Sequence, residues 1–126
     1  MNLNAILTLV DELRERNAQT ATALLGGAFC LSIERPTSDI PWLQLKSGVI
    51  NFYYDDDAPP EDRLAAKSVE LPPGFRCVEL APEKYATCEF EDVDAHTTRR
   101  LVRSLVLNYF DLPDDDSYSA EFIDLR

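Results

Sequence analysis

Two short runs rich in β-branched and aromatic residues lie next to each other in the middle of the chain, and they restrict the fold more than any other feature. Residues 42–46 and 49–54 have the composition of strands, and only Ser47 and Gly48 separate them. A two-residue connection of this kind is typical of a β-hairpin. The sequence therefore predicts an antiparallel sheet that includes residues 42–54.

The N-terminal segment has the spacing of an amphipathic helix. Its apolar residues recur three or four positions apart and form one stripe; they are Leu3, Ile6, Leu7, Val10 and Leu13. Asn2 or Asn4 can cap the first turn. We expect a helix over residues 3–17, with two alternatives beyond it. The helix continues to Leu25, or residues 20–25 form a strand that turns at Gly26-Gly27.

A second amphipathic stripe lies near the C-terminal end of the sequence. It consists of Leu101, Val102, Leu105, Val106, Tyr109 and Phe110. Asp92 or Asp94 can cap this helix at its start. Pro113 and the aspartates that follow it are expected to end the helix.

The remaining strand-like segments are short and alternate in polarity. They are residues 29–33, 69–71, 75–80, 85–90 and 119–125. Pro36 is expected to end the first of them, and Pro72-Pro73-Gly74 the second. Pro82 suits the second position of a type I turn that joins the next two. The last strand is expected at an edge of the sheet.

Residues 55–62 combine clustered aspartates with two prolines and are predicted to form a surface loop, with one helical turn over residues 63–67. The resulting order is a helix, about five to six antiparallel strands, a helix and a last strand. This order is typical of an α+β fold in which both helices pack on the sheet. The length of 126 residues predicts a single domain over residues 1–126.

The charge balance limits the partners that this chain can bind. It has 23 acidic side chains against 12 Lys and Arg, and the net charge is −11. Binding to nucleic acid or to anionic lipid needs a basic surface, so we expect neither partner. A basic protein is the expected partner, because opposite charges speed association. No secretion signal or membrane-span pattern is present, so we expect a cytoplasmic protein.

Catalytic and phosphate-binding patterns are missing from the sequence. His96 is the only histidine, and it lies in the first turn of the second predicted helix, where we expect an exposed side chain. No nucleophile elbow occurs. The four glycines cannot form a phosphate-binding loop. We therefore expect no enzymatic activity and no cofactor.

Metal-binding patterns fail as well. The sequence has three cysteines, Cys30, Cys77 and Cys88, and each lies in an apolar run. Their number is odd and they form no C-x-x-C pair, so we expect buried free thiols and no zinc site. Loops beginning at Asp55 or Asp111 lack the spacing of an EF-hand.

Two acidic segments lie next to tyrosines, and we predict that they bind the partner. The candidate residues are Tyr53, Tyr54, Asp55, Asp56, Asp57, Asp114, Asp115, Asp116 and Tyr118. Tyrosine is favoured at protein interfaces because it offers area and a hydroxyl group at low entropic cost. The alternative is that the aspartates are solvated loop charges and that one tyrosine of each group packs in the core.

Arg99, Arg100 and Arg103 form the only dense basic group. Such a group can bind a phosphate. Because Glu89, Glu91, Asp92 and Asp94 are close in the sequence, we expect ion pairs within the molecule instead.

The chain resembles bacterial immunity proteins of secreted-toxin systems in its size, in its net charge and in its segments 53–57 and 112–116. The resemblance is one of general type and transfers no individual residue. It implies that the protein neutralises a cognate toxin by covering its active site.

Two other classes share part of this character. Secretion chaperones for effector proteins are also small, acidic and α+β, but they normally end in a helix, whereas residues 119–125 predict a final strand. A small-molecule-binding regulatory domain is the third interpretation, and it rests on the segment 78–86. The sequence leaves the oligomeric state open.

Overall fold

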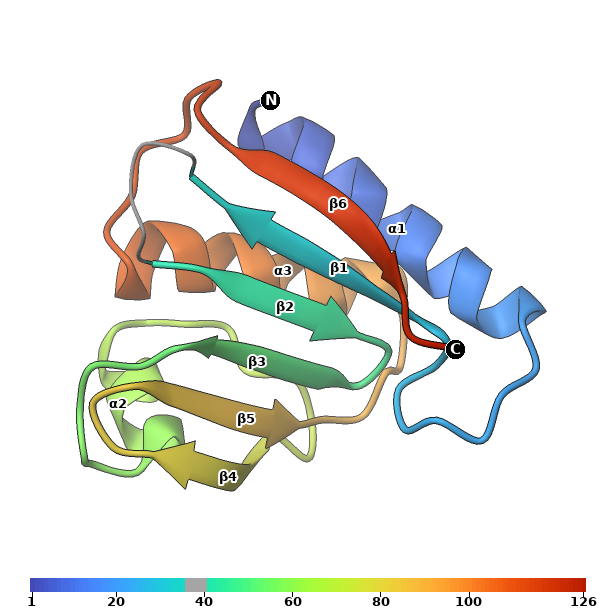
Figure 1. The fold of residues 1–126 in the computed structure, drawn as a ribbon. Coiled ribbons are helices and arrows are strands. Elements are labelled where there is room, and N and C mark those ends of the chain that lie inside the picture. The colour runs from blue at the N-terminus through green and yellow to red at the C-terminus, as the bar shows by residue number, and fades with distance from the viewer. Residues whose placement is uncertain (36–40) are drawn as a thin grey trace.

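An open sheet of six antiparallel strands forms one layer of the molecule (Figure 1). The computed structural model describes residues 1–35 and 41–126. The strands are β1 (Phe29–Glu34), β2 (Leu43–Lys46), β3 (Val49–Tyr53), β4 (Arg76–Ala81), β5 (Tyr85–Glu89) and β6 (Ser119–Asp124). They lie in the order β4-β5-β3-β2-β1-β6, so the last strand is an edge strand, as predicted. Pro36, the expected end of β1, lies outside the described residues.

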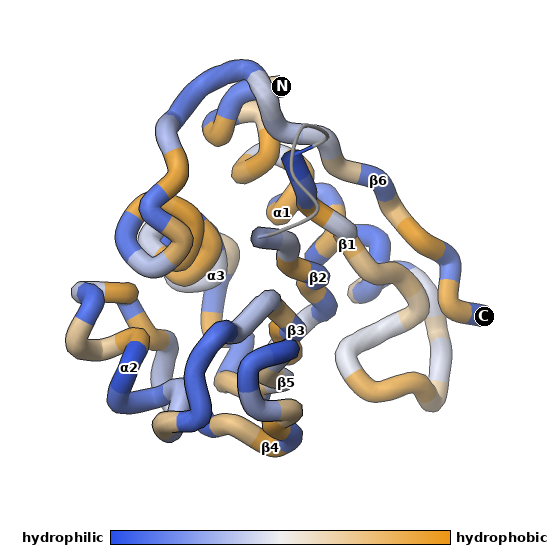
Figure 2. The backbone as a smooth tube through the Cα atoms, turned by 60° about the vertical axis from the view of Figure 1, so that its left-hand side comes forward, coloured by the Kyte–Doolittle hydropathy of each residue, from blue (hydrophilic) through white to orange (hydrophobic). Residues whose placement is uncertain are grey.

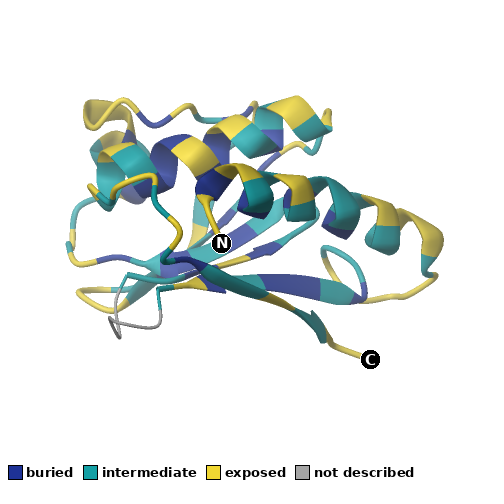
Figure 3. Ribbon diagram, turned by 90° about the horizontal axis from the view of Figure 1, so that it is seen from above, coloured by how far each residue is buried: buried dark blue, intermediate teal, exposed yellow. Residues whose placement is uncertain are grey.

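Three helices form the second layer. They are α1 (Leu3–Gln19), α2 (Pro60–Ala66) and α3 (Ala95–Ser104), and α3 continues into a π-helical turn at Leu105–Tyr109. All three lie behind the sheet in Figure 1. Figure 3 shows α1 and α3 on one side of the sheet and no helix on the other. This arrangement confirms the predicted α+β fold. Within the described residues, no helix combines the length and the apolar character that crossing a membrane requires.

The core fills the space between these two layers. Alternate strand residues point toward the helices; Leu31, Leu45, Ile50 and Phe52 have no exposed surface, and Leu101 of α3 packs against them. The same alternation appears along the tube in Figure 2 as changes between hydrophobic and hydrophilic colours. Burying a side chain of this size contributes roughly 1.5–3 kcal/mol. The predicted stripes of both helices therefore supply the core.

Helix α1 begins where the sequence predicts and ends soon after residue 17. The side-chain oxygen of Asn2 accepts a hydrogen bond from the N–H of Ala5 at 2.9 Å, which caps the helix. Residues 20–25 form neither more helix nor a strand, so both alternatives are wrong. The side chain of Asn17 explains this, because it accepts a hydrogen bond from Phe29 N–H at 2.8 Å and holds the returning chain. Gly27 has φ +104°, and a Cβ there would meet Asn17.

The central hairpin is confirmed. Lys46 and Val49 are paired, and Gly48 adopts φ +76° in the turn between them. The strand predicted at residues 69–71 is wrong. The N–H of Val69 donates to the carbonyl of Leu64, and that of Glu70 donates to the Ser104 hydroxyl at 2.8 Å. The backbone donors of this segment are therefore satisfied by helices and not by a neighbouring strand.

The turn type of the β4–β5 hairpin and the length of α2 both differ from the prediction. The N–H of Lys84 donates to the carbonyl of Ala81, which closes the turn, but Glu83 has φ +63°. Positive φ at the third turn position, after a proline, belongs to a type II turn and not to type I. Helix α2 is longer than the predicted single turn because Pro60 occupies its first position.

Helix α3 is capped by Asp94, one of the two predicted residues, which accepts a hydrogen bond from Thr97 N–H at 2.7 Å. Beyond Ser104 the helix widens, and the N–H of Phe110 donates to the carbonyl of Leu105, five residues earlier. This π-helical turn ends at Tyr109, and Asp111, two residues later, has φ +54°. Tyr109, the last residue of this turn, is partly buried, and its hydroxyl reaches Asp55 in the first acidic segment.

Candidate functional site

The two acidic segments singled out in the sequence lie at the same end of the sheet. We call residues 55–58 the first acidic loop and residues 111–117 the second acidic loop. The first follows β3 and the second follows the π-helical turn, and both lie on the left-hand side of Figure 1. The hydroxyl of Tyr109 donates to Oδ1 of Asp55 at 2.7 Å and so connects the end of the π-helical turn to the first loop.

Within the first acidic loop, Asp56 has a structural role. Its Oδ1 accepts hydrogen bonds from the N–H of Asp57 at 2.7 Å and of Ala58 at 3.0 Å. The hydrogen bond from Ala58, and then that from Asp57, lowers the pKa of Asp56. Arg63 of α2 lies 3.3 Å from Asp56 Oδ2, but its buried Nε–H forms no hydrogen bond. Asp57 is exposed and forms no ion pair with a described residue, and its side chain lies next to the Asp56 carboxylate.

The second acidic loop is built in a similar way around Asp115. Arg35, at the end of β1, donates two hydrogen bonds to this carboxylate, at 3.0 and 3.3 Å. The N–H of Ser117 donates a third at 3.0 Å. The contact with Arg35 is the main cause of the lowered pKa of Asp115. Asp114 accepts a hydrogen bond from Leu3 N–H at 3.3 Å, so it also holds the loop in place.

Two of the three candidate tyrosines hold the acidic loops from below. Tyr54 has no exposed surface, and its hydroxyl donates to the carbonyl of Ala58 at 2.6 Å. Tyr118 is 4% exposed, and its hydroxyl donates to the carbonyl of Pro113 at 2.5 Å. Burial raises the pKa of Tyr54 to about 12 and also raises that of Tyr118. Only Tyr53 is partly exposed, so Tyr54 and Tyr118 position the loops and are not surface anchors.

The surface of this end therefore differs from the predicted set of residues. Asp57 and Asp116 have exposed side chains. Asp111 is also exposed, although it was not in the predicted set. None of the three carboxylates forms an ion pair with a described residue. Asp111 was missed because the helix was expected to continue up to Pro113.

A cleft of about 480 Å³ lies beside the first acidic loop. It is lined by Tyr53, Asp55, Arg63, Lys67, Tyr109 and Phe110. Aromatic walls and charges of both signs suit a long polar side chain, since its stem can lie on the rings while its charged group pairs. Tyr109 and the two cations were not in the predicted site; the π-helical turn and α2 bring them there.

Two of the three arginines on α3 are paired within the molecule, but with partners other than the predicted ones. Arg99 binds Asp11 of α1 at 2.5 Å, and Arg103 lies 3.9 Å from Asp114. Arg100 is exposed and has no ion pair with a described residue. Of the expected partners, Asp92 binds Arg14 at 3.1 Å instead. His96 is exposed at the start of α3, as predicted.

The three cysteines differ in exposure, whereas the sequence predicted that all three are buried. Cys30 and Cys88 are buried free thiols, whereas Cys77 is partly exposed. Cys77 and Cys88 face each other across β4 and β5, and Glu61 lies beside them. The sequence contained a signal for this pair, because two strands at residues 75–80 and 85–90 with a four-residue turn place residues 77 and 88 opposite each other.

Comparison with known proteins adds no relative: no family model, no curated protein and no solved structure matches this chain.

Proposed function

We propose that the protein binds a basic protein partner through the acidic end of its sheet, in the manner of an immunity protein that covers a cognate toxin. The observation that carries this proposal is the position of three exposed carboxylates, Asp57, Asp111 and Asp116, on two loops that are distant in the sequence; none of them forms an ion pair with a described residue. Each loop is held by an aspartate that accepts backbone hydrogen bonds and by a buried tyrosine, and Arg35 also holds the second loop, so the carboxylates are held in place before a partner arrives. Such preorganisation reduces the entropic cost of binding.

The cleft supplies the second part of this proposal. A lysine or arginine of the partner can lie between Tyr53 and Tyr109 and reach Asp55 at the cleft wall. The Tyr109 hydroxyl already donates to Asp55, which leaves the second carboxylate oxygen for the incoming cation. Charged contacts of this kind set the rate and the specificity of association more than its final strength.

The test is to co-express the chain with the products of its neighbouring genes and to isolate any complex by size-exclusion chromatography. We expect a stoichiometric complex with one basic protein, whose activity falls when it is bound. The complex should be lost in a variant with Asp57→Asn, Asp111→Asn and Asp116→Asn. A matched control carries Glu15→Gln, Glu70→Gln and Glu121→Gln, three exposed residues elsewhere on the surface, and has the same net charge.

Two results would contradict the proposal. One is that both triple variants bind equally well, because the acidic end then has no special role. The other is that the chain is recovered as a dimer on a disordered segment of an acidic or neutral protein, which is the behaviour of a secretion chaperone.

A further inference from the structure

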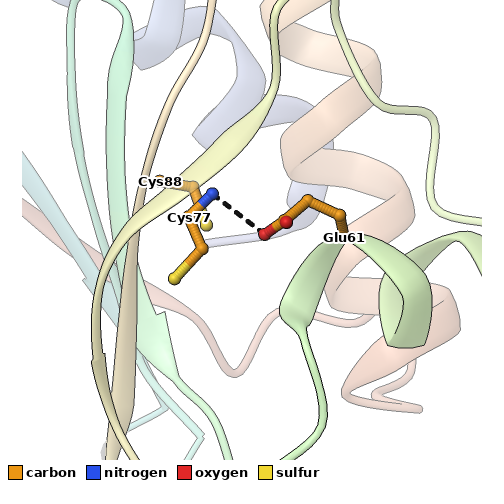
Figure 4. Close-up of side chains that lie close together, drawn as sticks. All are labelled: Glu61, Cys77 and Cys88. Atoms are coloured by element: carbon orange, nitrogen blue, oxygen red, sulfur yellow. Dashed lines mark hydrogen bonds between the residues drawn. The ribbon is translucent and has the colours of Figure 1, made fainter.

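Two thiols and one carboxylate from three different elements meet beneath α2 (Figure 4). Cys77 of β4 and Cys88 of β5 are direct partners across the two strands. Glu61 lies in the first turn of α2 and points toward both cysteines in Figure 4. One ligand atom from each residue, two sulfurs and one carboxylate oxygen, lies within 4.8 Å of the other two.

The carboxylate of Glu61 is held in this position by the backbone. The N–H of Cys77 donates to Oε1 of Glu61 at 2.9 Å, which leaves Oε2 free. A hydrogen bond that orients a ligand is a common feature of metal sites in proteins.

Access to the cluster comes from the edge of the sheet. β4 is an outermost strand, and a β-bulge between Cys77 and Glu79 interrupts its pairing with β5. Cys88 has no exposed surface, whereas Cys77 and Glu61 are partly exposed. An ion can therefore reach the two sulfurs from the solvent side while Cys88 anchors it in the protein.

We propose that Glu61, Cys77 and Cys88 bind one thiophilic divalent cation of the Zn²⁺ type, with water as the fourth ligand. Thiolates and a carboxylate are ordinary ligands of this ion, and three protein ligands plus water complete a tetrahedron. Metal–sulfur bonds of about 2.3 Å and metal–oxygen bonds of about 2.0–2.2 Å require ligand atoms about 3.5–3.8 Å apart. The cluster needs to contract by only about 1 Å to meet that geometry.

Binding must release protons, which gives the proposal a distinctive readout. A cysteine thiol has an ordinary pKa of about 8.5, so both thiols are mostly protonated at neutral pH in the metal-free protein. When the ion binds, two S–H bonds break, two sulfur–metal bonds form, and two protons pass to the solvent. Binding to surface carboxylates at neutral pH releases none.

The experiment uses the full chain, reduced with a phosphine and stripped of metal with a chelator, with Co²⁺ as a spectroscopic probe. We expect one Co²⁺ per chain, a thiolate-to-cobalt charge-transfer band, and about two protons released per ion in weak buffer. Zn²⁺ should abolish the band by displacing Co²⁺, and it should raise the melting temperature.

Variants assign the site to these residues. Cys77→Ser and Glu61→Gln should each weaken Co²⁺ binding at least tenfold, a minimum that follows from the roughly 10–100-fold cost of losing a group that only orients a ligand. Cys30→Ser is the matched control, because Cys30 lies on β1 and is separated from β5 by β2 and β3. It should leave both the band and the affinity unchanged.

The proposal is overturned if the reduced wild-type chain gives no thiolate band, or if fewer than one proton is released per ion. It is also overturned if Glu61→Gln and Cys30→Ser bind the ion equally well. If Cys77→Ser does not fold, the wild-type proton count and the Glu61→Gln variant still test the proposal. The side chain of Glu61 is partly exposed, so this substitution disturbs the core less. The partner-binding role of the acidic end is tested separately, so either proposal can fail alone.

Discussion

The two acidic loops are built from the same three parts, although 52 residues separate them in the sequence. Each has an aspartate that accepts backbone N–H bonds, an arginine beside that aspartate, and a buried tyrosine whose hydroxyl binds a loop carbonyl. In the first loop these are Asp56, Arg63 and Tyr54. In the second loop they are Asp115, Arg35 and Tyr118.

The loops differ in how closely the arginine contacts its aspartate and in whether a cleft lies beside them. Arg35 donates two hydrogen bonds to Asp115, and its guanidinium lies 4.9 Å from the ring centre of Tyr118. Arg63 forms only a looser pair with Asp56 and also borders the cleft. The comparison teaches that a run of aspartates is not uniform, because some carboxylates hold the loop while their neighbours stay exposed to solvent.

The largest effect should come from removing the tyrosine rings. Tyr54→Ala should lower the free energy of unfolding by about 3–5 kcal/mol, since it leaves a large cavity in the core. Tyr118→Ala should cost somewhat less, because the Tyr54 ring also packs against Phe52 and Tyr109. Denaturant unfolding measures both, with Tyr53→Ala as the partly exposed control. Equal losses for Tyr53 and Tyr54 would contradict this account of the loops.

Removing only the hydroxyl should separate positioning from packing. Tyr54→Phe and Tyr118→Phe should each cost about 1 kcal/mol, the typical net value of one hydrogen bond. Each substitution should increase amide hydrogen exchange in its own loop and leave the other loop unchanged. If Tyr54→Phe loosens both loops alike, they are not independent units.

Acid should weaken the two loops through Asp56 and Asp115. Both pKa values are lowered in the folded protein, so the unfolded chain takes up protons first as the pH falls. The stabilisation is therefore complete above the ordinary Asp pKa of about 3.9 and is lost as the pH falls through the lowered values.

Melting temperatures measured by circular dichroism from about pH 6 to pH 2 test this sign. Asp115→Asn should flatten the decrease more than Asp56→Asn, because Asp115 has the stronger arginine contact. An unchanged curve for Asp115→Asn would show that Arg35 does not stabilise the folded charge.

The smallest effect on stability should come from the free carboxylates. Asp57→Asn and Asp116→Asn should change the free energy of unfolding by less than about 0.5 kcal/mol, as exposed substitutions usually do. A larger loss in either variant would mean that its carboxylate has a structural partner like those of Asp56 and Asp115.

Local patterns were sufficient to predict the framework of the fold. The hairpin at Gly48 and the apolar stripes depend on neighbours within a few residues, so the sequence predicts them correctly. It narrows each helix cap to two residues, of which Asn2 and Asp94 are the caps in the structure. The strand expected at residues 69–71 failed because its backbone donors are satisfied by α2 and Ser104, which are remote contacts.

The candidate site was predicted only at the level of segments. Composition located both acidic loops, but it could not show which carboxylates receive hydrogen bonds from Arg35 or from backbone N–H groups. The π-helical turn that brings Tyr109 to Asp55 depends on the packing of α3 and has no distinct sequence pattern. The β-bulge in β4 and the position of α2 bring together Glu61, Cys77 and Cys88, and neither feature can be read from local sequence patterns.

The most direct test of the central claim is the association rate of the isolated partner with the chain as a function of salt. For the wild type, the rate should fall steeply as ionic strength rises, because screening removes the attraction. The triple variant Asp57→Asn, Asp111→Asn, Asp116→Asn should associate at least about tenfold more slowly at low salt and show a shallow dependence. The matched control Glu15→Gln, Glu70→Gln, Glu121→Gln should follow the wild type. A rate that does not respond to salt, or two triple variants with the same rate, would contradict the claim that this end of the sheet meets the partner.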